Sequence, residues 1–175
     1  WAAHWLQQKP GGVYAYDVMT RLSADGGRTW SEPQSPHDDG TATEHGFVSI
    51  THIGGRPYGV WLDGRETAGE GHDHAAAASA MTLRGAVLTP EGAIDGSEID
   101  DRVCDCCQTD LAVSGDALLV VYRNRSEDET RDIQSARLVD GAWTSPVTVH
   151  ADGWRIDACP VNGPAVAAHG DEVAV

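Results

Sequence analysis

The sequence predicts an all-β protein, and three observations support this fold class. Short apolar runs recur along the 175 residues and are separated by turn dipeptides such as Gly26-Gly27, Gly54-Gly55 and Gly115-Asp116. Twenty Gly and eight Pro stand against a single Phe, which indicates many turns. The nearest approach to a helical pattern, Ala75 to Met81, spans seven residues and is too short to form a stable helix alone.

Two internal similarities indicate a repeat of about 57 residues. The segments 30–40 and 143–153 share Trp, Pro, His, Asp and Gly at the same spacing, 113 residues apart. A second series, at 5–9, 61–65 and 121–125, is offset by 56 and then 60 residues. A unit of this length that holds about four strands has the size of one β-propeller blade.

The turn Ser23 to Trp30, SADGGRTW, matches the pattern Ser-x-Asp-x-Gly-x-Thr-Trp at every defined position. It resembles the Asp-box, or BNR repeat, of sialidases and related propellers. In that motif the Asp carboxylate accepts backbone N–H bonds across a hairpin, while glycine supplies positive φ and the Trp packs under neighbouring strands. We therefore interpret Ser23, Asp25, Gly27, Thr29 and Trp30 as a structural clip.

The resemblance implies a register, because the Asp-box joins the third and fourth strands of a blade. It predicts a partial blade over 1–40, with strands at 2–8, 13–22 and 29–37. A second blade covers 41–99, with strands near 47–53, 58–63, 76–83 and 86–94. A third covers 100–153, and a fourth begins at 154–175. We expect a fragment of a sialidase-type propeller, completed by further blades from the same full-length chain or from an oligomer.

Charge and hydropathy exclude two classes of partner. Lys plus Arg total 12 and Asp plus Glu total 27, which leaves a net charge of −15. Such a surface repels nucleic acid and anionic membranes, and no apolar run has the length of about 20 residues that a membrane span needs. The family resemblance and the cysteines together predict a periplasmic or secreted protein.

Blade topology predicts that ligands bind at the face opposite the Asp-box, where the loops between second and third strands meet the blade-to-blade connections. Lys9, Arg65 and Arg125 occupy equivalent positions after the second strand of three blades. Sialidases hold the substrate carboxylate with an arginine triad, and these three cations are the corresponding ligand-binding candidates. The alternative is that they are strand ends paired with nearby acids such as Asp63 or Glu66.

Whether the protein is an enzyme stays open at this point. A glycosidase needs two acidic groups beside the scissile bond, and the loop candidates are Glu44, Asp101 and Asp157. Sialidases use a Tyr activated by a Glu, whereas the four tyrosines of this chain all lie in predicted strands. The first arginine motif of the family is also not visible.

All four cysteines lie in segments that enter a blade, so we expect them to meet near the propeller axis. Three interpretations remain: disulfide bridges, free thiols, or a copper or zinc site completed by nearby imidazoles. The candidate ligands are Cys104, Cys106, Cys107, Cys159, His45, His72 and His74.

Two functions therefore compete. The first is a propeller that binds or hydrolyses a glycan at the loop face, as the resemblance to sialidases implies. The second is a non-catalytic propeller whose cysteine cluster binds a metal or joins two blades covalently.

Overall fold

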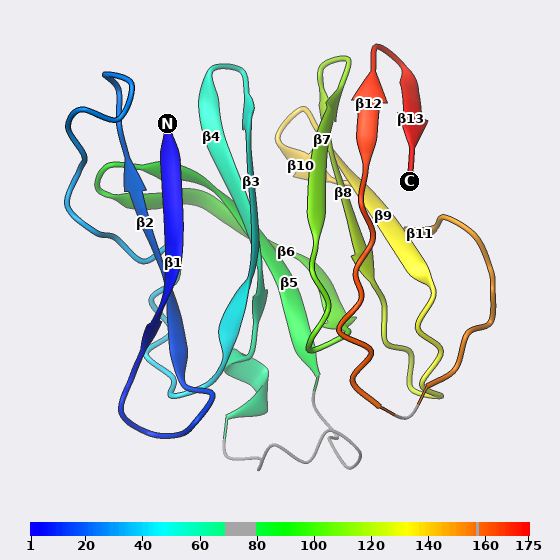
Figure 1. Cartoon of the computed structure of the whole chain (residues 1–175). Helices are drawn as coiled ribbons and strands as arrows, with labels where there is room; N and C mark the ends of the chain where they lie inside the picture. The colour runs from blue at the N-terminus through cyan, green and yellow to red at the C-terminus, as the bar shows by residue number, and fades with distance from the viewer. Residues whose placement is uncertain (69–79, 157) are drawn as a thin grey trace.

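The computed structural model describes residues 1–68, 80–156 and 158–175, and it confirms the all-β prediction (Figure 1). A short 3₁₀ turn, η1 (Arg65–Thr67), is the only helical segment among these residues. The strands are β1 (Ala2–Gln8), β2 (Tyr16–Leu22), β3 (His45–Ile53), β4 (Arg56–Asp63), β5 (Met81–Thr89), β6 (Gly92–Val103), β7 (Asp110–Ser114), β8 (Ala117–Arg123), β9 (Ile133–Val139), β10 (Ala142–Trp143), β11 (Val147–Thr148), β12 (Ala167–His169) and β13 (Glu172–Ala174).

Every strand pairing is antiparallel, and within each sheet consecutive strands pair, except that β11 pairs with β9. β1 pairs with β2, and an isolated bridge joins Thr20 of β2 to Gln34. The order β3-β4-β5-β6 forms a four-stranded sheet, and β7, β8, β9 and β10 form the next, with β11 also on β9. β12 and β13 form a final hairpin.

The predicted boundary between the strands 76–83 and 86–94 is wrong. Residues 84 and 85 lie inside β5, and the turn to β6 falls at 90–91. Gly85 is in the strand for a packing reason, because a Cβ there would lie 2.9 Å from the ring of Tyr58 and 3.1 Å from Val60. The glycine therefore marks a close contact between neighbouring strands and not a chain reversal.

The sheets stand side by side, with β3 against β7 and β7 against β12 (Figure 1). The described strands form a row of sheets and do not close into a ring. A shared apolar core fills the space between the two larger sheets. Side chains of β4 and β8 point alternately to the two faces of their sheets, so every second residue of each strand enters this core. Its members include Tyr58, Leu62, Leu83, Leu118 and Tyr122. The Trp143 indole N–H also donates to the Tyr58 hydroxyl across this interface, at 3.1 Å.

The two ends of the sheets differ in character (Figure 1). One end, which we call the hairpin face, carries the tight turns at 23–30, 54–55, 90–91, 115–116, 140–141 and 170–171. The opposite end, the loop face, carries the longer connections at 9–15, 38–44, 64–68, 104–109, 124–132 and 158–163. The Asp-box turn lies on the hairpin face, so it is remote from the loop face.

The turn at Ser23 to Trp30 is held by its own aspartate. Asp25 Oδ1 accepts the backbone N–H groups of Arg28 and Thr29 at 3.0 and 2.9 Å, and Oδ2 accepts the Thr29 hydroxyl at 2.7 Å. These bonds, led by the Thr29 N–H, lower the pKa of Asp25 to about 2. Trp30 donates from its indole N–H to the Gly27 carbonyl but remains 37% exposed, so it is only partly covered by the adjacent strands.

Candidate functional site

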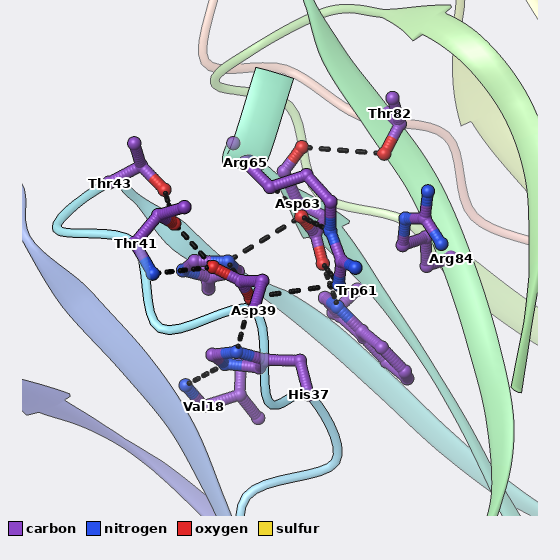
Figure 2. Close-up of polar contacts among 12 residues, drawn as sticks. Val18, His37, Asp39, Thr41, Thr43, Trp61, Asp63, Arg65, Thr82 and Arg84 are labelled. Carbon is purple, nitrogen blue, oxygen red and sulfur yellow. Dashed lines mark hydrogen bonds and ion pairs between the residues drawn. The ribbon is translucent and has the colours of Figure 1, made fainter. Parts of the chain in front are cut away.

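Five ionisable residues form a buried cluster near the loop face, between the β1–β2 hairpin and the β3–β6 sheet (Figure 2). We call this group the His–Asp cluster; its members are His37, Asp39, His45, Asp63 and Arg65. Asp39 and the preceding His37 come from the segment before β3, His45 is the first residue of β3, Asp63 is the last residue of β4, and Arg65 begins η1. Charged groups are rarely this buried unless they are paired.

Asp63 is the centre of the cluster and its side chain is 0% exposed. Arg65 grips the carboxylate with two N–H groups, Nε to Oδ1 and Nη2 to Oδ2, each at 2.8 Å. The Trp61 indole N–H adds a bond of 2.9 Å. Burial alone would raise the pKa of Asp63, but the bonds from Arg65 and His45 outweigh it and hold that pKa far below the usual range.

Asp39 joins the two histidines of the cluster. Its Oδ2 lies 3.0 Å from His37 Nδ1, and its Oδ1 accepts the backbone N–H and the hydroxyl of Thr41 (Figure 2). Burial opposes ionisation, yet the Thr41 bonds and the His45 charge hold the pKa of Asp39 at about 2. The other ring nitrogen of His37 accepts the Val18 N–H at 3.1 Å, so this histidine is the neutral Nδ1–H tautomer.

His45 is the histidine of the pair that faces both carboxylates. Its Nδ1 donates to the Tyr16 carbonyl at 3.0 Å, and its Nε2 lies 3.0 Å from Asp39 and 3.5 Å from Asp63. Burial lowers its pKa, but the bond and charge of Asp63, together with Asp39, raise it above the ordinary value. The ring stacks on His37 at 3.9 Å, and burial and the His45 charge lower the pKa of His37.

The cluster therefore places two carboxylates against two imidazoles and one guanidinium. Asp39, His45 and Asp63 also have atoms close enough to share a metal ion. The donor set does not fit one well, because Arg65 already occupies both Asp63 oxygens, both ring nitrogens of His37 and the Nδ1 of His45 are hydrogen-bonded, and the remaining nitrogen, His45 Nε2, is ion-paired with Asp39 and Asp63. The arrangement suits a structural role in joining β2, β3 and β4.

A second cluster, which we call the cysteine cluster, comprises Cys104, Cys106, Cys107 and Cys159. Cys106 and Cys159 form a disulfide with a Cα–Cα distance of 6.1 Å, and the sulfurs of Cys104 and Cys107 lie 2.9 Å apart. The Cys106 sulfur is within 4.8 Å of both. The expected meeting of the four cysteines is thus confirmed, with one bridge and two thiols.

The two thiols are buried and face guanidinium groups. Arg131 Nη1 donates to Cys104 Sγ at 3.1 Å. The Cys104 thiol donates to Cys107, which lowers the pKa of Cys107 to about 6 against the effect of burial, helped by the Asn162 N–H and by Arg123. The same bond, together with burial, raises the pKa of Cys104.

The backbone of the two cysteine-bearing segments touches at one point. A Cβ at Gly163 would lie 1.8 Å from the Gln108 carbonyl oxygen and 2.6 Å from its carbon. Only a glycine fits such a contact. The contact lies four residues after Cys159 and one after Cys107, so it adds to the disulfide in holding these segments together.

An ion-pair network surrounds the cysteine cluster on the loop face. Arg125 is 1% exposed and donates to Asp105 at 2.6 Å and to Glu129 at 3.0 Å. Arg131 pairs with the same Glu129 at 2.5 Å. Asp105 also accepts the Met81 N–H at 3.3 Å, which anchors the 104–107 turn to the start of β5.

The structure places the predicted cations in ion pairs. Lys9 Nζ lies 3.1 Å from Asp17, and Arg65 and Arg125 bind the carboxylates described above. Arg65 and Lys9 keep 23% and 27% of their side-chain surface exposed, whereas Arg125 is buried. Pairing with neighbouring acids was one of the two alternatives left open by the sequence.

The other candidates are dispersed. Glu44 is half-buried beside the His–Asp cluster, Asp101 is an exposed residue of β6, and His45 belongs to the His–Asp cluster and not to the cysteines. Asp157, His72 and His74 lie outside the described residues.

The one Tyr–carboxylate pair at hydrogen-bond distance in the described residues is a core contact. The Tyr122 hydroxyl donates to Asp100 Oδ2 at 2.5 Å, and Tyr122 is 1% exposed. Burial raises the pKa of Asp100, and it raises that of Tyr122 too, with the Asp100 charge adding to the effect. A buried neutral phenol has no access to a substrate, so this pair links β6 to β8.

Sequence reasoning missed His37, Asp39, Arg123 and Arg131 as site residues. A signal for the first two was present, because the His-x-Asp spacing recurs 113 residues later, at His150 and Asp152. Nothing local marked the two arginines, since their sulfur partners lie far along the chain.

Comparisons with known proteins add little. No family model matches the chain, and no curated protein matches it. Among solved structures, the alpha-L-arabinofuranosidase from Lactobacillus brevis is similar over 76% of this chain, with 12% identity and a TM-score of 0.42. The chain spans 46% of the length of that enzyme.

One finding bears on the cellular location. A disulfide such as Cys106–Cys159 is typical of oxidising compartments. Among the residues described here, we find no helix with the length and apolarity to cross a membrane.

Proposed function

We propose that the chain is part of an extracytoplasmic, sialidase-like β-propeller that binds or hydrolyses a glycan at its loop face. One observation carries this proposal: the loops that follow β1, β4 and β8, which carry the ion-paired Lys9, Arg65 and Arg125, all lie at the end opposite the Asp-box turn (Figure 1). Propellers place ligands where loops of several blades converge. The four-stranded antiparallel sheets of about one repeat each support the same architecture.

An acidic sugar is the ligand class that this face suits best, although the chain as a whole is acidic. Lys9, Arg65 and Arg125 follow the second strand in successive units, and guanidinium groups match a carboxylate geometrically. Lys9 and Arg65 have the exposed surface to meet a ligand directly. Arg125 would contribute through the field of the buried network. For hydrolysis, Glu44, Asp101 and Asp157 remain the proposed acids.

The test is binding of acidic and neutral sugars to the full-length protein, measured by calorimetry. We expect the double variant Lys9→Gln/Arg65→Gln to lose acidic-sugar binding by about 10-fold or more, as loss of charge-assisted bonds implies, and to spare neutral sugars. Arg28→Gln, an exposed cation on the hairpin face, is the matched control, and Asp25→Ala should lower stability without changing binding. Equal losses for both sugar classes, or no loss, would contradict the proposal and favour paired strand ends.

A second candidate is a non-catalytic propeller built around the cysteine cluster. The specific observation in its favour is the meeting of all four cysteines at the junction of two sheets, which neither glycan binding nor hydrolysis requires. The Cys106–Cys159 bridge joins segments that enter neighbouring units. The two remaining thiols leave room for a metal such as copper or zinc.

A further inference from the structure

We propose that Cys104 and Cys107 form a site for one soft monovalent cation, Cu(I), held between the two sulfurs. This inference deepens the second candidate function and does not depend on glycan binding. It names the ligands, the metal class and the two arginines that complete the site.

The turn after β6 presents the two sulfurs as a pair. Cys104 and Cys107 are separated by two residues, their sulfurs are 2.9 Å apart, and their side chains are almost fully buried. Asp105 between them is fixed by Arg125 and by the Met81 N–H, so the turn is held in place. The neighbouring sulfur of Cys106 is already bonded to Cys159. Two thiols are therefore the available donor set.

The charges around the sulfurs favour two thiolates over a second disulfide. Arg131 donates to the Cys104 sulfur at 3.1 Å. Arg123 lies beside Cys107, and its other contacts are the carbonyls of Asn162 and Arg131 and the ring of Trp154. Among the described residues Arg123 contacts no carboxylate, so a sulfur anion is its only negative partner.

A disulfide between Cys104 and Cys107, or two neutral thiols, would leave the half-buried Arg123 guanidinium without an anionic partner among the described residues. Two thiolates that share one monovalent cation carry a net charge of −1, which complements the positive charges of Arg123 and Arg131. The sulfurs must separate to admit the ion, and rotation of the two cysteine side chains supplies that movement.

The donor set selects the metal. Thiolate ligands favour soft ions such as Cu(I) and Zn²⁺ over hard ones. A structural zinc ion takes four protein ligands, whereas only two free thiols are present beside the closed bridge. Cu(I) accepts two-coordinate sulfur. On binding, two Cu–S bonds form, any thiol proton passes to solvent, and no electron is transferred.

The test is an anaerobic Cu(I) competition titration of the full chain against a chromophoric chelator, with the thiolate-to-copper absorption band as a second readout. We expect one Cu(I) per chain. Cys104→Ser and Cys107→Ser should each weaken binding by about 100-fold or more, since loss of a ligand exceeds the 10–100-fold effect of an outer partner. Arg123→Gln should weaken it by about 10-fold, and Arg137→Gln, an exposed arginine of β9, should not.

Controls separate this site from its alternatives. The double variant Cys106→Ser/Cys159→Ser should still bind Cu(I); loss of binding there would replace the two-thiolate site with a four-cysteine site and overturn the proposal. Intact-mass analysis after alkylation that shows Cys104 bridged to Cys107 would also overturn it, as would full Cu(I) affinity in both single serine variants. Circular dichroism establishes that each variant is folded. Sugar binding, measured on the same variants, should be unchanged, so failure here is distinguishable from failure of the glycan proposal.

Discussion

Two copies of the same short motif lie in opposite environments. His37 and Asp39 in the first unit, and His150 and Asp152 in the third, share the His-x-Asp spacing and the same Nδ1-to-carboxylate distance of 3.0 Å. The first pair has side chains 2% and 6% exposed, and the second has side chains 80% and 62% exposed. Their immediate sequence determines the contact but not its burial.

The difference arises from the sheet that follows. Next to His37, β3 brings His45 into a ring stack, β2 offers the Val18 N–H, and β4 brings Asp63 close to the pair. His150 has no contact beyond Asp152 among the described residues. The repeated His-x-Asp motif therefore contributes appreciably to electrostatic stability only where a neighbouring sheet shields it from water.

The sharpest way to break the comparison is the matched pair Asp39→Asn and Asp152→Asn. We expect Asp39→Asn to lower the free energy of unfolding by about 3–5 kcal/mol, because His45 and Arg65 lose a buried counter-charge. The amide also places N–H groups against imidazole N–H groups. Urea denaturation measures the loss, and a change below about 1 kcal/mol would show that the buried copy is energetically like an exposed one.

The Cys106–Cys159 bridge holds the segment after the exposed copy, and its removal should cost slightly less. The bridge closes a loop of 53 residues, and a typical effect is about 2–4 kcal/mol. Denaturation of Cys106→Ser/Cys159→Ser, followed by hydrogen exchange, should show β12 and β13 opening before β3 and β4. Uniform loss of protection would indicate that the two regions unfold as one unit.

The pH dependence of stability should also separate the copies. Asp39 has a folded pKa of about 2, below its ordinary value, so its stabilisation is complete above about pH 5 and is lost as the pH falls toward about 2. Wild type and Asp39→Asn should therefore converge in unfolding free energy over that range. A constant gap down to about pH 2 would contradict the assigned role of the carboxylate.

The smallest effect belongs to the exposed copy. Asp152→Asn should change the free energy of unfolding by less than about 0.5 kcal/mol, because an exposed ion pair is solvated in either state. Chemical denaturation of this variant beside wild type is sufficient. A loss of about 1 kcal/mol or more, twice the usual range for an exposed substitution, would mean that another part of the full-length protein covers this motif.

The sequence was most informative where contacts are short in range. The turn at Asp25 could be predicted at the level of single residues because its acceptors and donors lie within a few positions of one another. The all-β class followed in the same way from turn spacing. The strand boundary near Gly85 could not be predicted from the sequence, because the ring of Tyr58 that requires the glycine belongs to another strand.

The candidate site shows the same limit. Proximity of the cysteines followed from their place at the entries to successive units, but the choice of Cys159 as the partner of Cys106 depends on local backbone geometry. The His–Asp cluster depends on contacts between residues 39, 45 and 63, whose charges are unremarkable in an acidic chain. Only the recurrence of His-x-Asp in the repeat hinted at it.

The contact of Gly163 with the Gln108 carbonyl constrains how such a sequence can change. At most surface positions of a repeat, drift by single substitutions is tolerated, but here the first added carbon would overlap backbone atoms and separate two units. A new unit made by copying the 158–175 segment would inherit that requirement, and it would fit only beside a neighbour whose chain approaches equally closely. Both duplication and divergence of this segment must therefore keep the glycine at position 163.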